Sequence, residues 1–216
     1  MPKARESAMI IIEKVVLPSR EELRERDNYC HLHRTAEMIG NFNRILDESG
    51  SETDIHNYLL AYPEMLYNAL YKTSYGHHGM KILSKQALAP KTSYNKGMIP
   101  DFILGRDSSE GIGWFVIELK GYNDDLFKIS KSEIGFSSTA NKGICQLLEY
   151  MDKGSELQSY IRDYLKLDGF RNPKGILLMG KKSELESNER KKKLRRIFHE
   201  AVPSIQLINY DVLRSM

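Results

Sequence analysis

The sequence predicts an α/β fold in which a small mixed β-sheet is flanked by helices. Short apolar runs bounded by glycine or proline are typical of buried strands, and segments with an apolar residue every three or four positions are typical of amphipathic helices. Along the chain these patterns follow the order helix, three strands, helix, strand, helix, strand, which is an α/β order. A length of 216 residues, with 41% hydrophobic and 28% charged residues, is ordinary for a folded globular protein.

Residues 1–50 are expected to form an N-terminal strand and helical segment. The apolar run at residues 8–17 predicts the strand. Glu13 and Lys14 interrupt this run, and it is far shorter than a membrane-spanning helix, so no membrane partner is expected.

A helical stretch is predicted after this strand. Ser19 and Glu22 fit a capping box at its start, and the sequence ESGS at residues 48–51 ends it. Its apolar spacing is irregular, so one long helix and two helices with a break near Gly40 are both open interpretations.

Residues 51–216 are expected to form the main domain. Ser51 and Asp54 signal the start of a helix, Pro63 bends or restarts the chain into a short helix, and residues 80–90 predict a strand. The apolar positions of the first helix have the spacing of an amphipathic helix: Ile55, Tyr58, Leu59 and Tyr62.

The stretch from Ile99 to Gly121 predicts two strands separated by the polar turn at residues 105–113. Residues 122–143 are mixed and rich in turn formers, which predicts a loop that covers or edges a site.

The remaining chain predicts a helix from about Ser138, a helix or continuation at 155–167, a strand at 174–180, a helix at 189–202 and a strand at 204–213. We expect the first and third of these helices to turn apolar stripes inward, namely Ile144, Leu147, Leu148 and Met151, and Leu194, Ile197, Phe198 and Ala201.

Three charged residues stand among the apolar residues of the predicted hairpin, where each is costly to bury. If the hairpin is centred on Ser109 and Glu110, the residue numbers of any two opposite residues add up to 219, so Asp101 faces Glu118. Lys120 follows two residues later and therefore projects from the same face. Two acids and one amine are thus predicted to converge.

Two such carboxylates repel each other, and a divalent cation between them removes that penalty. Mg²⁺ suits the site because it prefers oxygen ligands and retains water and substrate phosphate oxygens beside one or two protein carboxylates. A water activated in this way and oriented by Lys120 could attack a phosphodiester.

These residues resemble a known motif. Pro100-Asp101, a variable turn, then Glu118-Leu119-Lys120 resembles the PD-(D/E)XK motif of the restriction-endonuclease-like superfamily. With Gln146 and Tyr150 downstream and a helix opening at Glu52 upstream, the order of motifs resembles the nuclease domain of the Shedu family of bacterial anti-phage proteins.

The resemblance covers about residues 51–216 and implies a restriction-endonuclease-like core. It implies Mg²⁺-dependent cleavage or nicking of phage or other foreign DNA by a cytoplasmic homo-oligomer, with Mn²⁺ as a substitute ion. The metal ligands it implies are Asp101, Glu118 and the Leu119 carbonyl. Lys120 would position the attacking water, Gln146 would orient Lys120 or a phosphate, and Glu52 would complete the metal shell.

Alternative interpretations remain open for each of these residues. The strand charges could form a structural ion pair on an exposed hairpin, Glu52 could be favoured only by the helix dipole, and Gln146 with Tyr150 could be an ordinary helix flank. At the level of function, the alternatives are a non-catalytic nucleic-acid-binding or regulatory module on the same fold and a repair or recombination nuclease.

Charge and cysteine content constrain the partners only loosely. The net charge is +3, but residues 171–200 carry a local net charge of +6, which fits either DNA backbone binding or a solvated helix face. Two distant cysteines do not suggest disulfides, so the cytoplasm is expected. The possible zinc ligands match no strong spacing pattern: Cys30, His31, His33, His56, His77 and His78.

Overall fold

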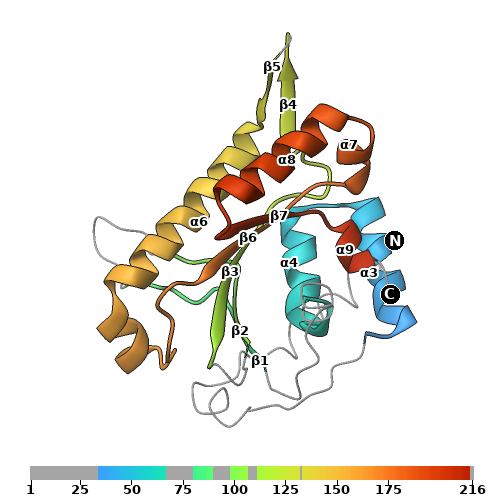
Figure 1. Ribbon diagram of the computed structural model, residues 1–216. Helices are drawn as coiled ribbons and strands as arrows, with labels where there is room; N and C mark the ends of the chain where they lie inside the picture. The colour runs from blue at the N-terminus through green and yellow to red at the C-terminus, as the bar shows by residue number, and fades with distance from the viewer. Residues whose placement is uncertain (1–33, 67–79, 90–97, 107–110, 132, 215–216) are drawn as a thin grey trace.

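A computed structural model describes residues 34–66, 80–89, 98–106, 111–131 and 133–214. Within these ranges five strands form one mixed sheet in the order β1, β2, β3, β6, β7 (Figure 1). β1 to β3 are antiparallel neighbours, and β6 and β7 continue parallel to β3. The strand bounds are Met80–Ser84, Phe102–Arg106, Gly113–Leu119, Lys174–Leu178 and Ile205–Ile208. The predicted α/β class with a small mixed sheet is confirmed.

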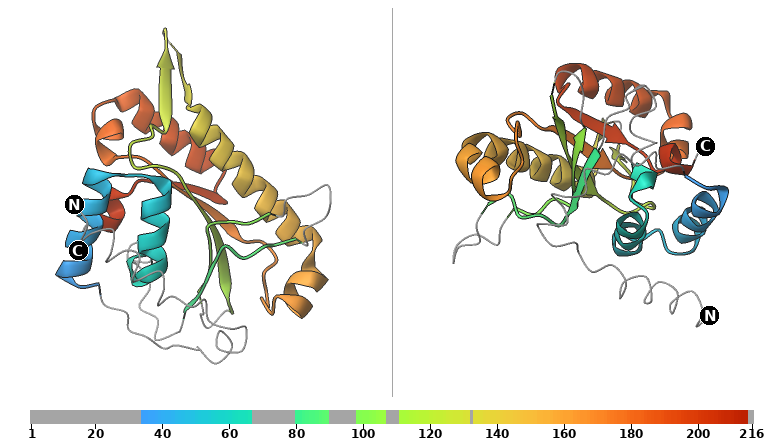
Figure 2. Two further views of the ribbon diagram at one scale, coloured as in Figure 1. Left: turned by 180° about the vertical axis from the view of Figure 1, so that it is seen from behind. Right: turned by 90° about the horizontal axis from the view of Figure 1, so that it is seen from below.

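Helices cover both faces of this sheet (Figure 2). One face packs against α3 (Ala36–Glu48), α4 (Glu52–Ala61) and α9 (Asp211–Arg214), and the other against α6 (Ser138–Glu156) and α8 (Glu189–Ala201). Alternation along β3 explains the two cores, because Ile117 and Leu119 join the first while Trp114 and Val116 join the second. Every residue that projects from the second face near the end of β3 therefore points toward α6.

The first described helices begin at capping residues. Thr35 caps α3, which runs through Gly40 without a break, so a break near that glycine is not formed. Ser51 caps α4 by accepting the amide of Asp54, as predicted. The strand expected at residues 8–17 and the helix start at Ser19 lie outside the described residues. α3 packs into the same core as α4, and the proposed domain boundary after residue 50 stays a prediction.

The loop prediction for residues 122–143 is wrong in part. β4 (Phe127–Ser130) and β5 (Glu133–Phe136) form a separate antiparallel hairpin that projects beyond the sheet (Figure 1). Phe127 stacks on Phe136 and both join the second core, whereas Ile129, two residues along β4, is 53% exposed. The polar flanks of this segment hid a short strand pattern.

Two predicted helix faces need correction. Leu148 on α6 and Ile197 and Ala201 on α8 are exposed rather than inward. On α8 the side chain of Lys191 is buried instead, because it reaches Glu184 of α7 (Lys182–Glu186). A short π-helix, Tyr160–Tyr164, follows α6 where a helix or continuation was expected. Among the described helices, none is long and apolar enough to cross a membrane.

Gly105 shows how tightly β2 and β3 pair. It lies directly opposite Trp114, and a Cβ atom at Gly105 would approach the indole ring to 2.5 Å. We expect Gly105→Ala to destabilise the protein by about 1–3 kcal/mol, since overpacking forces the buried ring to move. Chemical denaturation should show a lower midpoint with an unchanged m-value. Gly135→Ala is the control, because a Cβ atom at Gly135 would meet nothing within 4 Å; equal stability of the two variants would contradict the prediction.

Candidate active site

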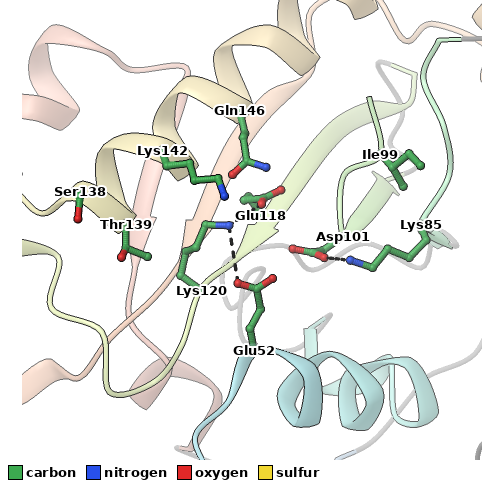
Figure 3. A pocket seen from close by; sticks show the side chains of 10 residues that line it. All are labelled: Glu52, Lys85, Ile99, Asp101, Glu118, Lys120, Ser138, Thr139, Lys142 and Gln146. Atoms are coloured by element: carbon green, nitrogen blue, oxygen red, sulfur yellow. Dashed lines mark hydrogen bonds and ion pairs between the residues drawn. The ribbon is translucent and has the colours of Figure 1, made fainter. Parts of the chain in front are cut away.

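The charged residues predicted from the strands meet at one pocket, where β3 ends (Figure 3). The pocket has a volume of about 460 Å³. Its lining combines three acids, three lysines and four uncharged residues: Glu52, Asp101, Glu118, Lys85, Lys120, Lys142, Ile99, Ser138, Thr139 and Gln146. The formal charge of the lining is therefore zero.

Strand pairing explains why these side chains are neighbours. Phe102 lies opposite Ile117, which confirms the predicted register. Continued by one residue, the same register places Asp101 opposite Glu118. The register of β1 with β2 likewise continues to Lys85 opposite Asp101. Because opposed residues project from the same face of a sheet, the three form a row across three neighbouring strand ends.

Asp101 is held firmly at the centre of this row. It is only 3% exposed, its Oδ2 accepts the backbone N–H of Leu119 at 2.8 Å, and its Oδ1 accepts the Lys85 ammonium group. Lys85 itself has a side chain that is 51% exposed. A buried carboxylate thus presents its free lone pairs to the pocket beside a cation that can reach solvent.

Glu118 is the second buried carboxylate and is 4% exposed. Its Oε1 accepts the Lys120 ammonium at 2.6 Å and its Oε2 accepts the Tyr150 hydroxyl at 3.3 Å. Burial, followed by repulsion from Asp101, raises the pKa of the Glu118 carboxyl despite the Lys120 hydrogen bond. Ionisation of this side chain therefore lowers the stability of the folded state, and a bound cation would offset that loss.

This shift predicts a pH dependence of stability. The pKa of Glu118 is higher in the folded state than its ordinary value of 4.5, so the folded state holds the proton to a higher pH than the unfolded state does. The contribution of Glu118 to the free energy of unfolding therefore falls as pH rises from about 4.5 through the folded pKa. We expect Glu118→Gln to remove this loss. Thermal unfolding of both proteins in chelator should show the stability of wild type relative to the variant falling as pH rises. Parallel curves would contradict the assignment.

Lys120 is fixed at its backbone on both sides. Its N–H donates to the Leu178 carbonyl at 3.0 Å, and its carbonyl accepts the buried Tyr210 hydroxyl at 2.7 Å. Its ammonium group also lies 3.8 Å from Oε2 of Glu52 at the start of α4. Gly143 lets α6 approach, since a Cβ there would lie 3.4 Å from Cε of Lys120 and 2.6 Å from a side chain of β6. The amine is thus held in place beside both acids.

A stripe along α6 forms the opposite wall. Lys142, Gln146 and Tyr150 recur every four residues and share one helix face. The Gln146 amide donates to the Tyr150 hydroxyl at 3.5 Å, and that hydroxyl lies 3.3 Å from the carbonyl of Ile99. Oε1 of Gln146 is buried and has no hydrogen-bond partner among the described residues. This oxygen can accept a hydrogen bond from a bound ligand or from a lysine.

The donor set fits a hard divalent cation held through few protein ligands. Asp101 and Glu118 offer carboxylate oxygens, which Mg²⁺ prefers, and the pocket has room for the waters that this ion retains. Within the described ranges, no group of three or more His, Cys, Asp or Glu side chains is close enough to hold an ion by itself. Asp101 and Glu118 are therefore the best candidates for direct contact, while a role for Glu52 in the metal shell and for the Leu119 carbonyl stays a prediction.

The structure brings the predicted residues Glu52, Asp101, Glu118, Lys120 and Gln146 to one pocket. Two cations of this pocket were not predicted from the sequence. Lys142 could have been found by extending the four-residue spacing of Gln146 and Tyr150 back along the helix. Lys85 could not, because the segment between β1 and β2 is too long to give a register.

The other candidate sites are less developed. His56 stacks on Phe102 and contacts the Ser84 hydroxyl, whereas the remaining residues considered for zinc lie outside the described ranges. In the basic run on α8, Lys192 and Arg196 pair with acids of the same helix. Neither a zinc site nor DNA binding by α8 gains support from these contacts.

Comparison with known proteins places this pocket within one family. The family model described as Shedu protein SduA, C-terminal, matches residues 49–213, which include all ten residues that line the pocket. No curated protein gives a significant match to the chain.

Proposed function

The chain belongs to the Shedu protein SduA C-terminal family, and on this premise we propose that it is a metal-dependent DNA endonuclease of bacterial anti-phage defence. The observation that carries the proposal is the pair of buried carboxylates, Asp101 and Glu118, with the Lys120 amine 2.6 Å from the second. Burying two like charges side by side is unfavourable for stability, so a chemical role is the better explanation of the arrangement.

The proposed reaction is hydrolysis of one DNA phosphodiester. A water oxygen bonds to phosphorus, the P–O bond to one sugar breaks, the leaving oxygen becomes a hydroxyl by gaining a proton, and the attacking water loses one to solvent. A divalent ion held by Asp101 and Glu118 would acidify that water and offset charge on the phosphate. Lys120 donates a hydrogen bond that orients the water, and its positive charge stabilises the more negative transition state.

The residues that line the walls of the pocket favour binding of a polyanionic substrate. Lys142 and Lys85 stand at its sides, and the hydroxyls of Ser138 and Thr139 lie at the first turn of α6, where the helix dipole favours negative charge (Figure 3). With a bound divalent ion the neutral lining would become positive, which suits a phosphate backbone.

The test is cleavage of circular and linear DNA by purified protein with Mg²⁺ or with a chelator. We expect wild type to give nicked or linear products with Mg²⁺ and none with chelator. Mn²⁺ in place of Mg²⁺ should restore part of this cleavage, and Glu118→Gln should give no products with either ion. Glu149→Gln is the matched control, because this exposed residue lies on the outer face of α6. DNA binding without cleavage in all proteins would favour the non-catalytic module, and equal cleavage by Glu118→Gln would contradict this site.

The proposed role in defence needs a separate experiment. Cells that carry the wild-type gene should survive phage challenge better than cells that carry Glu118→Gln. Equal survival, together with sensitivity of the gene-deficient cells to DNA damage, would instead indicate a repair or recombination nuclease. A homo-oligomer is part of the proposal, and a monomer in analytical ultracentrifugation would contradict that part.

A further inference from the structure

Lys85 lines the pocket but takes no part in the bond-making and bond-breaking steps of the proposed reaction. It follows β1 directly, its N–H donates to the Asp101 carbonyl at 3.1 Å, and its ammonium group pairs with Oδ1 of the same residue. Its backbone φ of 49° lies in the left-handed region, which costs a non-glycine residue about 1–2 kcal/mol. Two contacts to one residue thus hold Lys85 in an unfavourable conformation beside the site.

This ammonium group occupies one of the two oxygens that Asp101 could offer to a metal ion. Asp101 has two oxygens, one engaged by the Leu119 N–H and the other by Lys85. An ion on either oxygen of Asp101 would lie within a few ångströms of the ammonium group and repel it. The Asp101 side chain is buried while that of Lys85 is 51% exposed, so Lys85 is the partner free to move away.

The other two pocket lysines differ in this respect. Lys120 is buried, anchored at its backbone on both sides, and bound to Glu118. Lys142 lines the pocket but, within the described residues, has no carboxylate partner. Lys85 alone of the three both engages a candidate metal ligand and has access to solvent.

We propose that Lys85 and the metal ion compete for Asp101, and that a phosphate of bound DNA takes up the displaced ammonium group. The inference rests on the proposed function and adds to it a means by which DNA controls metal loading. A phosphate that draws Lys85 away from Asp101 strengthens metal binding, and by linkage the metal strengthens DNA binding by the same factor. The ion would thus be bound tightly mainly when substrate is present.

The first test measures Mg²⁺ affinity by calorimetry with full-length protein and no DNA. Lys85→Met removes the competing charge and is expected to bind Mg²⁺ about tenfold more tightly than wild type. Lys142→Met removes the same charge from the same pocket without freeing Asp101, so its gain should be markedly smaller. Lys85→Arg should remain close to wild type. If Lys85 merely orients Asp101, Lys85→Met would bind the ion more weakly, which would overturn the inference.

The second test measures the coupling between metal binding and DNA binding. Ca²⁺ affinity is determined with and without a short DNA duplex, using Ca²⁺ to limit hydrolysis. The gain in affinity on adding DNA should be about tenfold smaller in Lys85→Met than in wild type and in Lys174→Met, whose substitution lies outside the pocket. An equal gain in all three proteins would contradict the proposed competition.

The two proposals can fail separately. A wild-type protein that binds no divalent ion and cleaves no DNA would overturn both the proposed function and this inference. If wild type binds the ion and cleaves, but Lys85→Met has unchanged or weaker metal affinity, only the inference fails.

Discussion

Lys120→Met is expected to lower the rate of DNA cleavage by about 10²–10³-fold without weakening metal binding. The substitution keeps an unbranched side chain that is one atom shorter, and it removes the amine that orients the attacking water and balances transition-state charge. It also leaves Glu118 buried beside Asp101 without its 2.6 Å partner, so a divalent ion should bind at least as tightly as in wild type. Single-turnover cleavage and calorimetry measure the two effects independently.

Comparison with Glu118→Gln separates the roles of the two residues. Glu118→Gln should lose both cleavage and tight metal binding, whereas Lys120→Met should lose only cleavage. Lys174→Met is the control, because Lys174 is exposed at the start of β6, outside the pocket. Near wild-type cleavage by Lys120→Met would show that the amine is structural.

The largest expected loss of stability comes from Glu184→Ala, outside the pocket. Glu184 accepts the backbone N–H groups of Leu126 and Phe127, each at 2.8 Å, and pairs with Lys191 at 2.9 Å. The side chains of this pair are 6% and 10% exposed. Removing the carboxylate leaves the buried Lys191 charge and two backbone N–H groups without their partner. The free energy of unfolding should fall by about 3–5 kcal/mol and Tm by on the order of 10 °C.

Two variants test this explanation. Glu186→Ala removes an exposed ion pair with Lys182 from the same short helix and should cost at most about 1 kcal/mol. Glu184→Ala combined with Lys191→Met should recover part of the lost stability, since no unpaired charge then remains buried. A single variant as stable as Glu186→Ala would contradict the role given to Glu184.

The sequence was sufficient to predict which charged residues meet in the pocket because only six residues separate β2 from β3. Turn length fixes the register of a hairpin, so the pairing of Asp101 with Glu118 could be calculated, and strand alternation added Lys120. Helical spacing similarly predicted that Gln146 and Tyr150 share one face. Local geometry determines each of these relations.

The remaining features depend on contacts between distant segments. Lys85 reaches Asp101 through a strand pairing that spans a long connection, and no local pattern gives its register. Lys191 is buried, against its position in a basic run, because Glu184 lies beside it in the fold. Such tertiary pairing decides which charges are buried, and the spacing of residues along one element does not record it.

The most direct measurement for the proposed site is anomalous diffraction at the manganese absorption edge, from crystals of the protein grown at a saturating concentration of Mn²⁺. We expect a single strong peak in the pocket, within bonding distance of carboxylate oxygens of both Asp101 and Glu118, and no peak there in Asp101→Asn. A wild-type pocket without a peak, or a manganese ion held by other residues while these two carboxylates keep only their lysine partners, would contradict the proposed site.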